Sequence, residues 1–279
     1  MDIPIIDTNF MNGGVGTSPT NPPKLLNWVN YTTNCRYAED LIINKKVPLF
    51  VTDNSLLQNY NVSKKIAWLL EPKAIKPRFY TPESLDFIHK NYSYVLTHEQ
   101  ELIERYNNFL FVPGCSIFSV VNETLPVKDK LLSIITSSKD NTEGQKFRIE
   151  TTKKVKGYDL FGRGFKEINF KNEALEPYMF SIAIENSMSN FYFTEKVLDC
   201  FCTKTIPIYR GCDLSKWFNS DGIIYFKTQE ELQDIIDNKL SKELYESKLS
   251  VIEENFNTVL NDYRCVEDFI VKNYPFLFQ

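Results

Sequence analysis

Long apolar runs and a leader-like N-terminus are both missing from this 279-residue sequence. No uninterrupted hydrophobic stretch approaches the ~20 residues that a bilayer-spanning helix needs. The first seven residues lack the basic segment followed by an apolar segment that marks a secretory signal peptide. These two absences predict a soluble, cytoplasmic protein without a transmembrane segment.

Residues that build metal sites are also scarce. The sequence has two histidines and six cysteines, and the only close pair, Cys200 and Cys202, does not have the spacing of a zinc site. It also has no Asp-x-Asp motif of the kind that holds a divalent cation on a diphosphate. We therefore expect no metal and no other cofactor.

A strong excess of positive charge is absent as well. Lysine and arginine number 32 against 36 acidic residues, which gives a net charge of -4 and argues against a nucleic-acid partner. The hydrophobic fraction of 43% and the charged fraction of 24% are typical of globular proteins, and the length fits two domains.

What the sequence does contain is an alternation of short apolar runs with helical patterns, which predicts an α/β fold with parallel sheets. The expected strands are residues 3–6, 47–52, 66–70, 94–97, 110–112, 131–136, 158–161, 179–184 and 205–209. The expected helices open at residue 81 or span residues 98–106, 142–154, 194–201 and 230–236. Residues 120–130 are polar and contain Pro126, so we interpret them as a linker between domains 1–125 and 126–279. Two such halves imply a cleft, with ligands at the carboxyl ends of the strands.

The strand at residues 179–184 leads into the most informative stretch. Glu185 and Asn186 follow the strand, Thr194 is the expected N-cap of the next helix, and Glu195 and Lys196 lie in its first turn. A lysine there opposes the helix dipole but suits a bound diphosphate, so the pattern favours an anion site. For any one of these residues alone, a surface ion pair is the simpler interpretation.

The order of these motifs resembles the donor-binding signature of glycosyltransferase family 10, the α1,3/4-fucosyltransferases. That signature runs Phe-x-(Leu/Ile)-x-Phe-Glu-Asn-Ser, then Tyr-(Val/Ile)-Thr-Glu-Lys, then Pro-(Ile/Val) before a glycine. Residues 180–187, 192–196 and 207–211 supply these elements, with Ile184 in place of phenylalanine and Arg210 before the glycine. The segments around Ser138, Arg148 and Arg163 are also similar, and the resemblance covers roughly residues 131–226.

The resemblance implies a GT-B fold, in which two Rossmann-like domains face each other across a cleft. It implies an inverting transfer of fucose from GDP-fucose to a hydroxyl of a glycan acceptor, with Lys196 and Arg148 neutralising the diphosphate, Glu195 holding the ribose or sugar, and Asn186 and Tyr192 lining the pocket. The residues expected at the donor site are Ser138, Arg148, Arg163, Glu185, Asn186, Tyr192, Thr194, Glu195 and Lys196. A transferase for another nucleotide sugar and a non-catalytic nucleotide-sugar-binding protein remain alternatives.

An inverting transfer also needs a general base, which this family places in the N-terminal domain. The best match is Glu71, which follows the apolar run 66–70 and precedes Pro72. Burial beside Trp68 would raise the pKa of its carboxyl group into a useful range. The alternative is a loop carboxylate without a role. We give little weight to the glycine cluster at residues 13–16 and to His98.

Overall fold

The computed structural model describes residues 1–7, 18 and 20–279, and the chain divides into two compact units. The first unit comprises Met1–Ser116, Ser189–Phe191 and Cys265–Gln279, and the second comprises Ile117–Met188 and Tyr192–Arg264. The second unit begins at residue 117, before the boundary expected at residue 125. Residues 265–279 belong to the first unit, whereas the sequence predicts them in the second domain. The N–H groups of Phe118 and Ser119 donate to the buried carboxylate of Asp199. These hydrogen bonds connect residues 118 and 119, which the sequence predicts in the first domain, to the second unit.

The first unit is built on a parallel sheet with the strand order β2-β1-β3-β4-β5-β6. Its strands are β1 (Asp2–Ile6), β2 (Asn27–Asn30), β3 (Leu49–Thr52), β4 (Lys65–Trp68), β5 (Tyr94–Thr97) and β6 (Phe109–Phe111). All five strands expected in this half are present, with ends that shift by one or two residues. The sequence did not reveal β2, because asparagines flank its two apolar residues and no apolar run is visible.

Helices of the first unit are α1 (Cys35–Asn44), η2 (Asp53–Ser55), η3 (Pro77–Tyr80), α2 (Pro82–Asn91), α3 (Gln100–Arg105), α10 (Val266–Asn273) and η6 (Pro275–Phe278). The helix expected from residue 81 is α2, and Thr81 caps it by accepting a bond from the N–H of Ser84 at 3.2 Å. Leu85 and Ile88 of α2 pack into a core with Val51 and Val95 of the sheet.

The second unit contains a parallel sheet with the strand order β11-β10-β9-β7-β8. Its strands are β7 (Lys130–Ile135), β8 (Asp159–Phe161), β9 (Tyr178–Ile184), β10 (Ile206–Arg210) and β11 (Ile224–Tyr225). All seven residues of β9 are buried, as expected for a central strand whose two faces are both covered by helices. The four strands expected in this half are confirmed, and β11 is additional.

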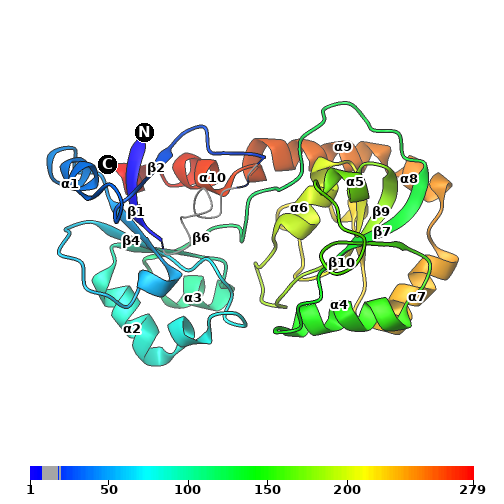
Figure 1. Ribbon diagram of the computed structural model, residues 1–279, viewed down its shortest axis with the longest axis horizontal. Helices are drawn as coiled ribbons and strands as arrows, with labels where there is room; N and C mark the ends of the chain where they lie inside the picture. Colours follow the sequence, from blue (N-terminus) through cyan, green and yellow to red (C-terminus); the bar gives the residue numbers. More distant parts are fainter. Residues whose placement is uncertain (8–17, 19) are drawn as a thin grey trace. The chain divides into compact units, whose positions relative to one another are not determined.

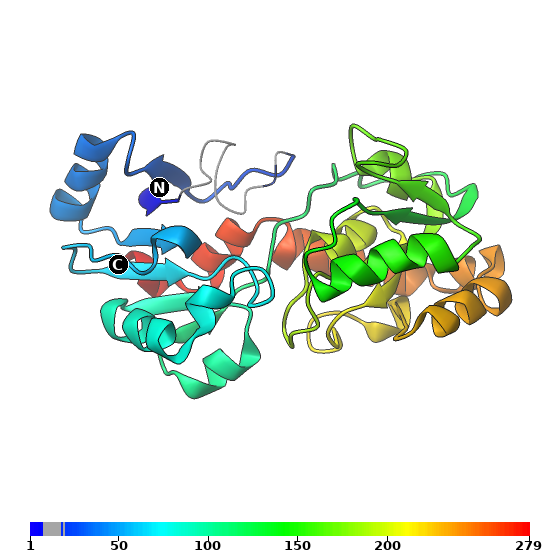
Figure 2. The ribbon, with the colours of Figure 1, turned by 60° about the horizontal axis from the view of Figure 1, so that its bottom comes forward.

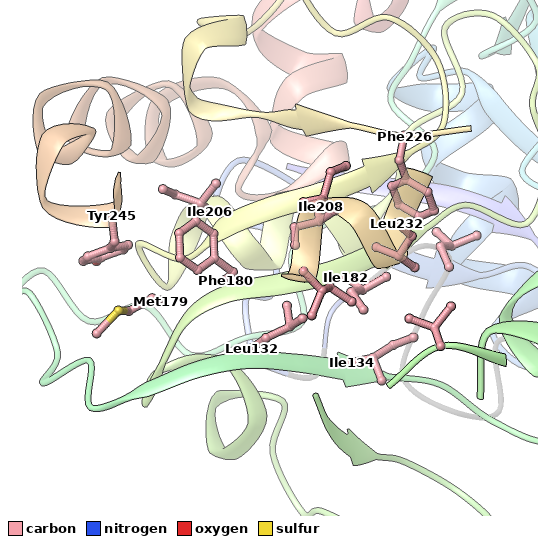
Figure 3. Close-up of a cluster of buried hydrophobic side chains, with 14 of the residues drawn as sticks. Leu132, Ile134, Met179, Phe180, Ile182, Ile206, Ile208, Phe226, Leu232 and Tyr245 are labelled. Carbon is pink, nitrogen blue, oxygen red and sulfur yellow. The ribbon is translucent and has the colours of Figure 1, made fainter. Parts of the chain in front are cut away.

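Helices of the second unit are α4 (Glu143–Lys154), α5 (Asn172–Leu175), α6 (Glu195–Cys202), η4 (Ser220–Gly222), α7 (Gln229–Asn238), α8 (Lys242–Ser247), α9 (Leu249–Thr258) and the π-helical turn η5 (Val259–Tyr263). Figure 1 shows α4 and α7 on one face of this sheet and α5 and α6 on the other. Figure 2 brings α4 to the front of the sheet. In Figure 3, Leu232 of α7 packs against Ile182 and Ile208, in the core that holds α7 on the sheet.

Local sequence fixes where the helices of the second unit begin. Thr142 and Gln145 form a reciprocal capping box at the start of α4, and Thr228 caps α7 as its spacing to Glu231 predicts. Gly144 allows α4 to approach the end of β9 closely, because a Cβ atom at this position would lie 1.8 Å from the carbonyl oxygen of Glu185. None of the helices in the described part of the chain is long and apolar enough to cross a membrane.

Candidate nucleotide-sugar site

A cavity of about 230 Å³ lies at the carboxyl edge of the second sheet. It is formed by the ends of β7 and β9, the loop after β8, one side chain of α4 and the first two turns of α6. Its polar lining residues are Thr136, Ser137, Arg148, Arg163, Lys171, Ser181, Glu195, Lys196 and Asp199. The sequence predicted a ligand site at this edge, and four of the residues that it selected line the cavity.

Arg148 is a fixed cation in the wall of the cavity. Helix α4 carries it, and its side chain is buried. The guanidinium donates one hydrogen bond to the carbonyl of Ile184 and one to Oδ1 of Asn186, the latter at 2.7 Å. Burial lowers the pKa of Arg148, and the nearby carboxylates of Glu185 and Glu195 oppose this effect. An arginine remains protonated in such surroundings, so the cavity keeps a positive charge.

Glu185 does not line the cavity but holds the start of α6. It is fully buried at the end of β9, and its carboxylate accepts bonds from the N–H of Thr194 at 2.9 Å and from the hydroxyl of Thr194 at 2.7 Å. Burial raises the pKa of this carboxyl group, and the positive charge of Lys196 acts in the opposite direction. Glu185 thereby holds the N-cap of α6 in place, so that the first turn of α6 is fixed at the cavity.

Lys196 lies among oxygen atoms rather than alone at the start of α6. Its Nζ is 3.0 Å from Oγ1 of Thr194, 3.2 Å from Oε1 of Glu195 and 3.6 Å from Oε2 of Glu185. The sequence alone predicts a charge that opposes the helix dipole without compensation. In the folded protein, two carboxylates compensate this charge. Its side chain is 20% exposed and still lines the cavity.

Two further charged residues of the cavity were missed by the sequence reasoning. Nζ of Lys171, just before α5, is 2.7 Å from Oδ2 of Asp199 and 3.4 Å from Oε1 of Glu195. Burial disfavours the ionised form of Glu195, but Lys196 and Lys171 together hold its pKa below the ordinary value. Glu195 and Asp199 lie one turn apart on α6, where like charges repel each other. The pair therefore favours a nearby cation, but nothing in the sequence indicates that this cation is Lys171.

The other residues expected at the donor site lie around this cavity. Arg163 lines it from the loop after β8, where Gly162 adopts a φ of 114° that lets the loop pass close to the carbonyl of Thr136. Ser138 is exposed beside Gly164, whereas Asn186 reaches the cavity only through its bond to Arg148. Tyr192 is buried, and its carbonyl accepts a bond from the thiol of Cys212.

Glu71 belongs to the first unit and follows β4, as the sequence predicted. Its carbonyl accepts a hydrogen bond of 2.7 Å from the hydroxyl of Tyr80, and its side chain is partly exposed. His98 is buried after β5, and burial lowers the pKa of its imidazole to about 3, so it is neutral at physiological pH. The glycine cluster at residues 13–16 lies outside the described residues.

No group of three or more histidine, cysteine, aspartate or glutamate side chains is placed to hold a metal ion within residues 1–7, 18 and 20–279.

Two parallel sheets, each covered by its own helices, give the chain the GT-B fold of glycosyltransferases, and solved structures share this architecture. The Anabaena protein Alr3699/HepE in complex with UDP and glucose superposes with a TM-score of 0.64 over 99% of both chains, at 8% identity. An α1,3-fucosyltransferase with GDP superposes with a TM-score of 0.55 over 96% of this chain and 92% of its own, at 15% identity.

Sequence comparison confirms the resemblance to glycosyltransferase family 10. Residues 125–246 match the family model "Glycosyltransferase family 10 (fucosyltransferase) C-term". The α-(1,3)-fucosyltransferase FucT of Helicobacter pylori is 26% identical over an alignment that covers 68% of this chain but only 40% of that protein. Together with the fold, these findings support a glycosyltransferase.

Proposed function

We propose that the chain is an inverting glycosyltransferase that transfers fucose from GDP-fucose to a hydroxyl group of a glycan. One observation carries the proposal: Arg148 and Lys196 line a single cavity at the first turn of α6, inside the region that matches the fucosyltransferase family model. Two cations beside a helix N-terminus suit the diphosphate of a nucleotide sugar.

The donor would be held mainly by charge and by the carboxylate of Glu195. The planar guanidinium of Arg148 can meet two phosphate oxygens, and Lys196 adds a point charge. Lys171 and Lys196 favour the ionised form of Glu195, and an ionised carboxylate is a strong acceptor for ribose or sugar hydroxyls. The cations of the cavity would neutralise the diphosphate, as a divalent cation does in many other transferases.

The transfer would be a single displacement with Glu71 as the general base. The acceptor oxygen attacks the anomeric carbon, the bond from that carbon to the β-phosphate oxygen breaks, and GDP leaves with the electron pair. Glu71 takes the proton of the acceptor hydroxyl. One displacement inverts the anomeric centre. Support for Glu71 comes from its place after β4 and from the resemblance to family 10.

A melting-temperature panel with GDP, UDP and GDP-fucose, followed by a GDP-release assay with simple glycans, tests the proposal. We expect GDP to stabilise the protein more than UDP, and Arg148→Ala to abolish this shift. Lys154→Ala is the matched control, because Lys154 ends the same helix but pairs with Glu150 in solvent. Equal shifts with GDP and UDP would overturn the guanine assignment. GDP binding without turnover on any glycan would point to a binding protein.

A further inference from the structure

A buried carboxylate that the proposed reaction does not use lies against the main chain of Glu71. Asp53 opens η2 directly after β3 and is 5% exposed. Its Oδ1 accepts a hydrogen bond from the N–H of Leu70 at 2.9 Å. Asp53 therefore holds the peptide N–H of the residue that directly precedes the candidate base.

The other side of the same peptide segment is also held. The hydroxyl of Tyr80, which is 8% exposed at the end of η3, donates to the carbonyl of Glu71 at 2.7 Å. Pro72 follows, and its ring restricts the next φ angle. The carbonyl of Glu71 is thus fixed by Tyr80, and the N–H of the preceding residue, Leu70, is fixed by Asp53. Such fixation reduces the number of positions that the carboxylate of Glu71 can take.

An aspartate is an unfavourable choice for this task unless its charge matters. An asparagine oxygen could accept the same bond from Leu70 without placing a charge in a buried site. Lys76 gives only partial compensation, since its Nζ donates to Oδ1 of Asn54 at 3.2 Å. Burial, aided by the negative charge of Glu71, raises the pKa of Asp53 to about 7, while the N–H of Leu70 and the charge of Lys76 act in the opposite direction.

We propose that Asp53 is a positioning residue for Glu71, and that the two carboxyl groups titrate as a coupled pair. This inference rests on the proposed role of Glu71 as the general base. Above neutral pH the Asp53 carboxylate is ionised, holds the N–H of Leu70 firmly and repels the negative charge of Glu71. When Asp53 is protonated, it holds this N–H group less firmly.

Charged groups around this pair also affect its titration. Asp53 is influenced by Glu71 and Lys76, and Tyr80 is influenced by Glu99 as well as by the two carboxylates of the pair. Burial raises the pKa of the Tyr80 hydroxyl well above its ordinary value, so it stays protonated and keeps donating to Glu71. A titration near pH 7 in this part of the chain can thus be assigned by removing one group at a time.

The activity test compares wild type with Asp53→Asn and Tyr80→Phe from pH 5.5 to 8.5, with GDP-fucose and a glycan. For Asp53→Asn we expect a kcat at least tenfold lower at pH 8, an unchanged KM for the donor, and an activity profile without the inflection near pH 7. Tyr80→Phe should lower kcat but keep that inflection, because it removes the other hydrogen bond and leaves the carboxylates. Wild-type kcat and an unchanged profile in Asp53→Asn would overturn the proposal.

A melting experiment tests the coupling without any turnover. Burial raises the pKa of Asp53 in the folded protein above its ordinary value to about 7, so its ionisation lowers stability as the pH rises from about 4 to about 7. Asp53→Asn should therefore melt higher than wild type at pH 8 but not at pH 4. In a Glu71→Gln background, the pH at which half of this difference in melting temperature has developed (the midpoint) should be lower, because the charge of Glu71 is gone.

These two readouts separate the failure of the inference from the failure of the proposed function. An unchanged midpoint in the Glu71→Gln background would show that the carboxyl groups do not interact, and would overturn the coupling even if the enzyme is active. If wild type neither binds GDP nor transfers fucose, the proposed function is wrong. A shifted midpoint would then still establish the carboxylate pair, with Glu71 in another role.

Discussion

Replacing Lys196 by alanine should weaken donor binding and also destabilise the protein, and the two effects have separate physical causes. The ammonium group lines the cavity, and a charge-assisted bond to a phosphate contributes about 1.5–3 kcal/mol. The affinity for GDP should therefore fall roughly ten- to a hundredfold. The second effect arises at Glu185, which is fully buried and has Lys196 at 3.6 Å.

The size of the stability loss follows from that distance and from the exposure of the lysine. At an effective dielectric constant of about 20, two unit charges at this separation attract by roughly 4–5 kcal/mol. Lys196 is 20% exposed, and Thr194 continues to bond the carboxylate, so the net loss should be smaller, about 1–3 kcal/mol. If Lys196 only opposed the helix dipole, its replacement would instead be neutral or slightly stabilising.

The pH dependence identifies the cause. Burial raises the pKa of Glu185 above its ordinary value, so ionising this group lowers stability as the pH rises, and Lys196 offsets part of that loss. The melting difference between wild type and Lys196→Ala should be small near pH 4.5 and large at pH 8.

Thermal melts at several pH values and calorimetry with GDP on the same preparations provide the assay. Adding Glu185→Gln to the alanine variant should restore much of the melting temperature but not the affinity for GDP. Lys154→Ala, which removes an exposed lysine of α4, should change neither quantity. If Lys196→Ala melts like wild type at pH 8 and binds GDP as tightly, both the ion pair and the donor-site assignment are refuted.

Three further predictions concern other parts of the molecule. Glu71→Gln should keep the affinity for GDP but lower turnover by roughly 10²–10⁴-fold, and near wild-type transfer would place the base elsewhere. EDTA should leave most transfer activity intact, whereas a complete loss restored by manganese would reveal a metal requirement. Gly144→Ala would put a Cβ atom 1.8 Å from the carbonyl oxygen of Glu185, so denaturant unfolding should show a loss of about 1–3 kcal/mol or more, and GDP should bind less tightly because α4 carries Arg148.

Much of the fold could be read from the sequence because its signals are local. Apolar runs bounded by polar residues predicted nine of the eleven strands found in the described part of the chain, and threonines at residues 142, 194 and 228 marked helix starts that the structure confirms. The two strands that were missed are short: β2 has two apolar residues between asparagines, and β11 is two residues long within the apolar run 223–226. The polar segment 120–130 looked like a linker, yet contacts distant in sequence assign it to the second unit.

The donor motif was also visible in the sequence, because a strand, a loop and a helix start that follow one another bring Glu185, Thr194 and Lys196 together over a short stretch. The sequence could not show which distant residues pair with the charged side chains. Lys171 meets Asp199 across 28 positions, and Asp53 meets the N–H of Leu70 across 17. These pairs arise because the carboxyl ends of parallel strands, and the loops that follow them, converge at one edge of a sheet. Hydrophobic periodicity determines that the strands exist, but the strand order and the packing of the helices decide which residues become neighbours.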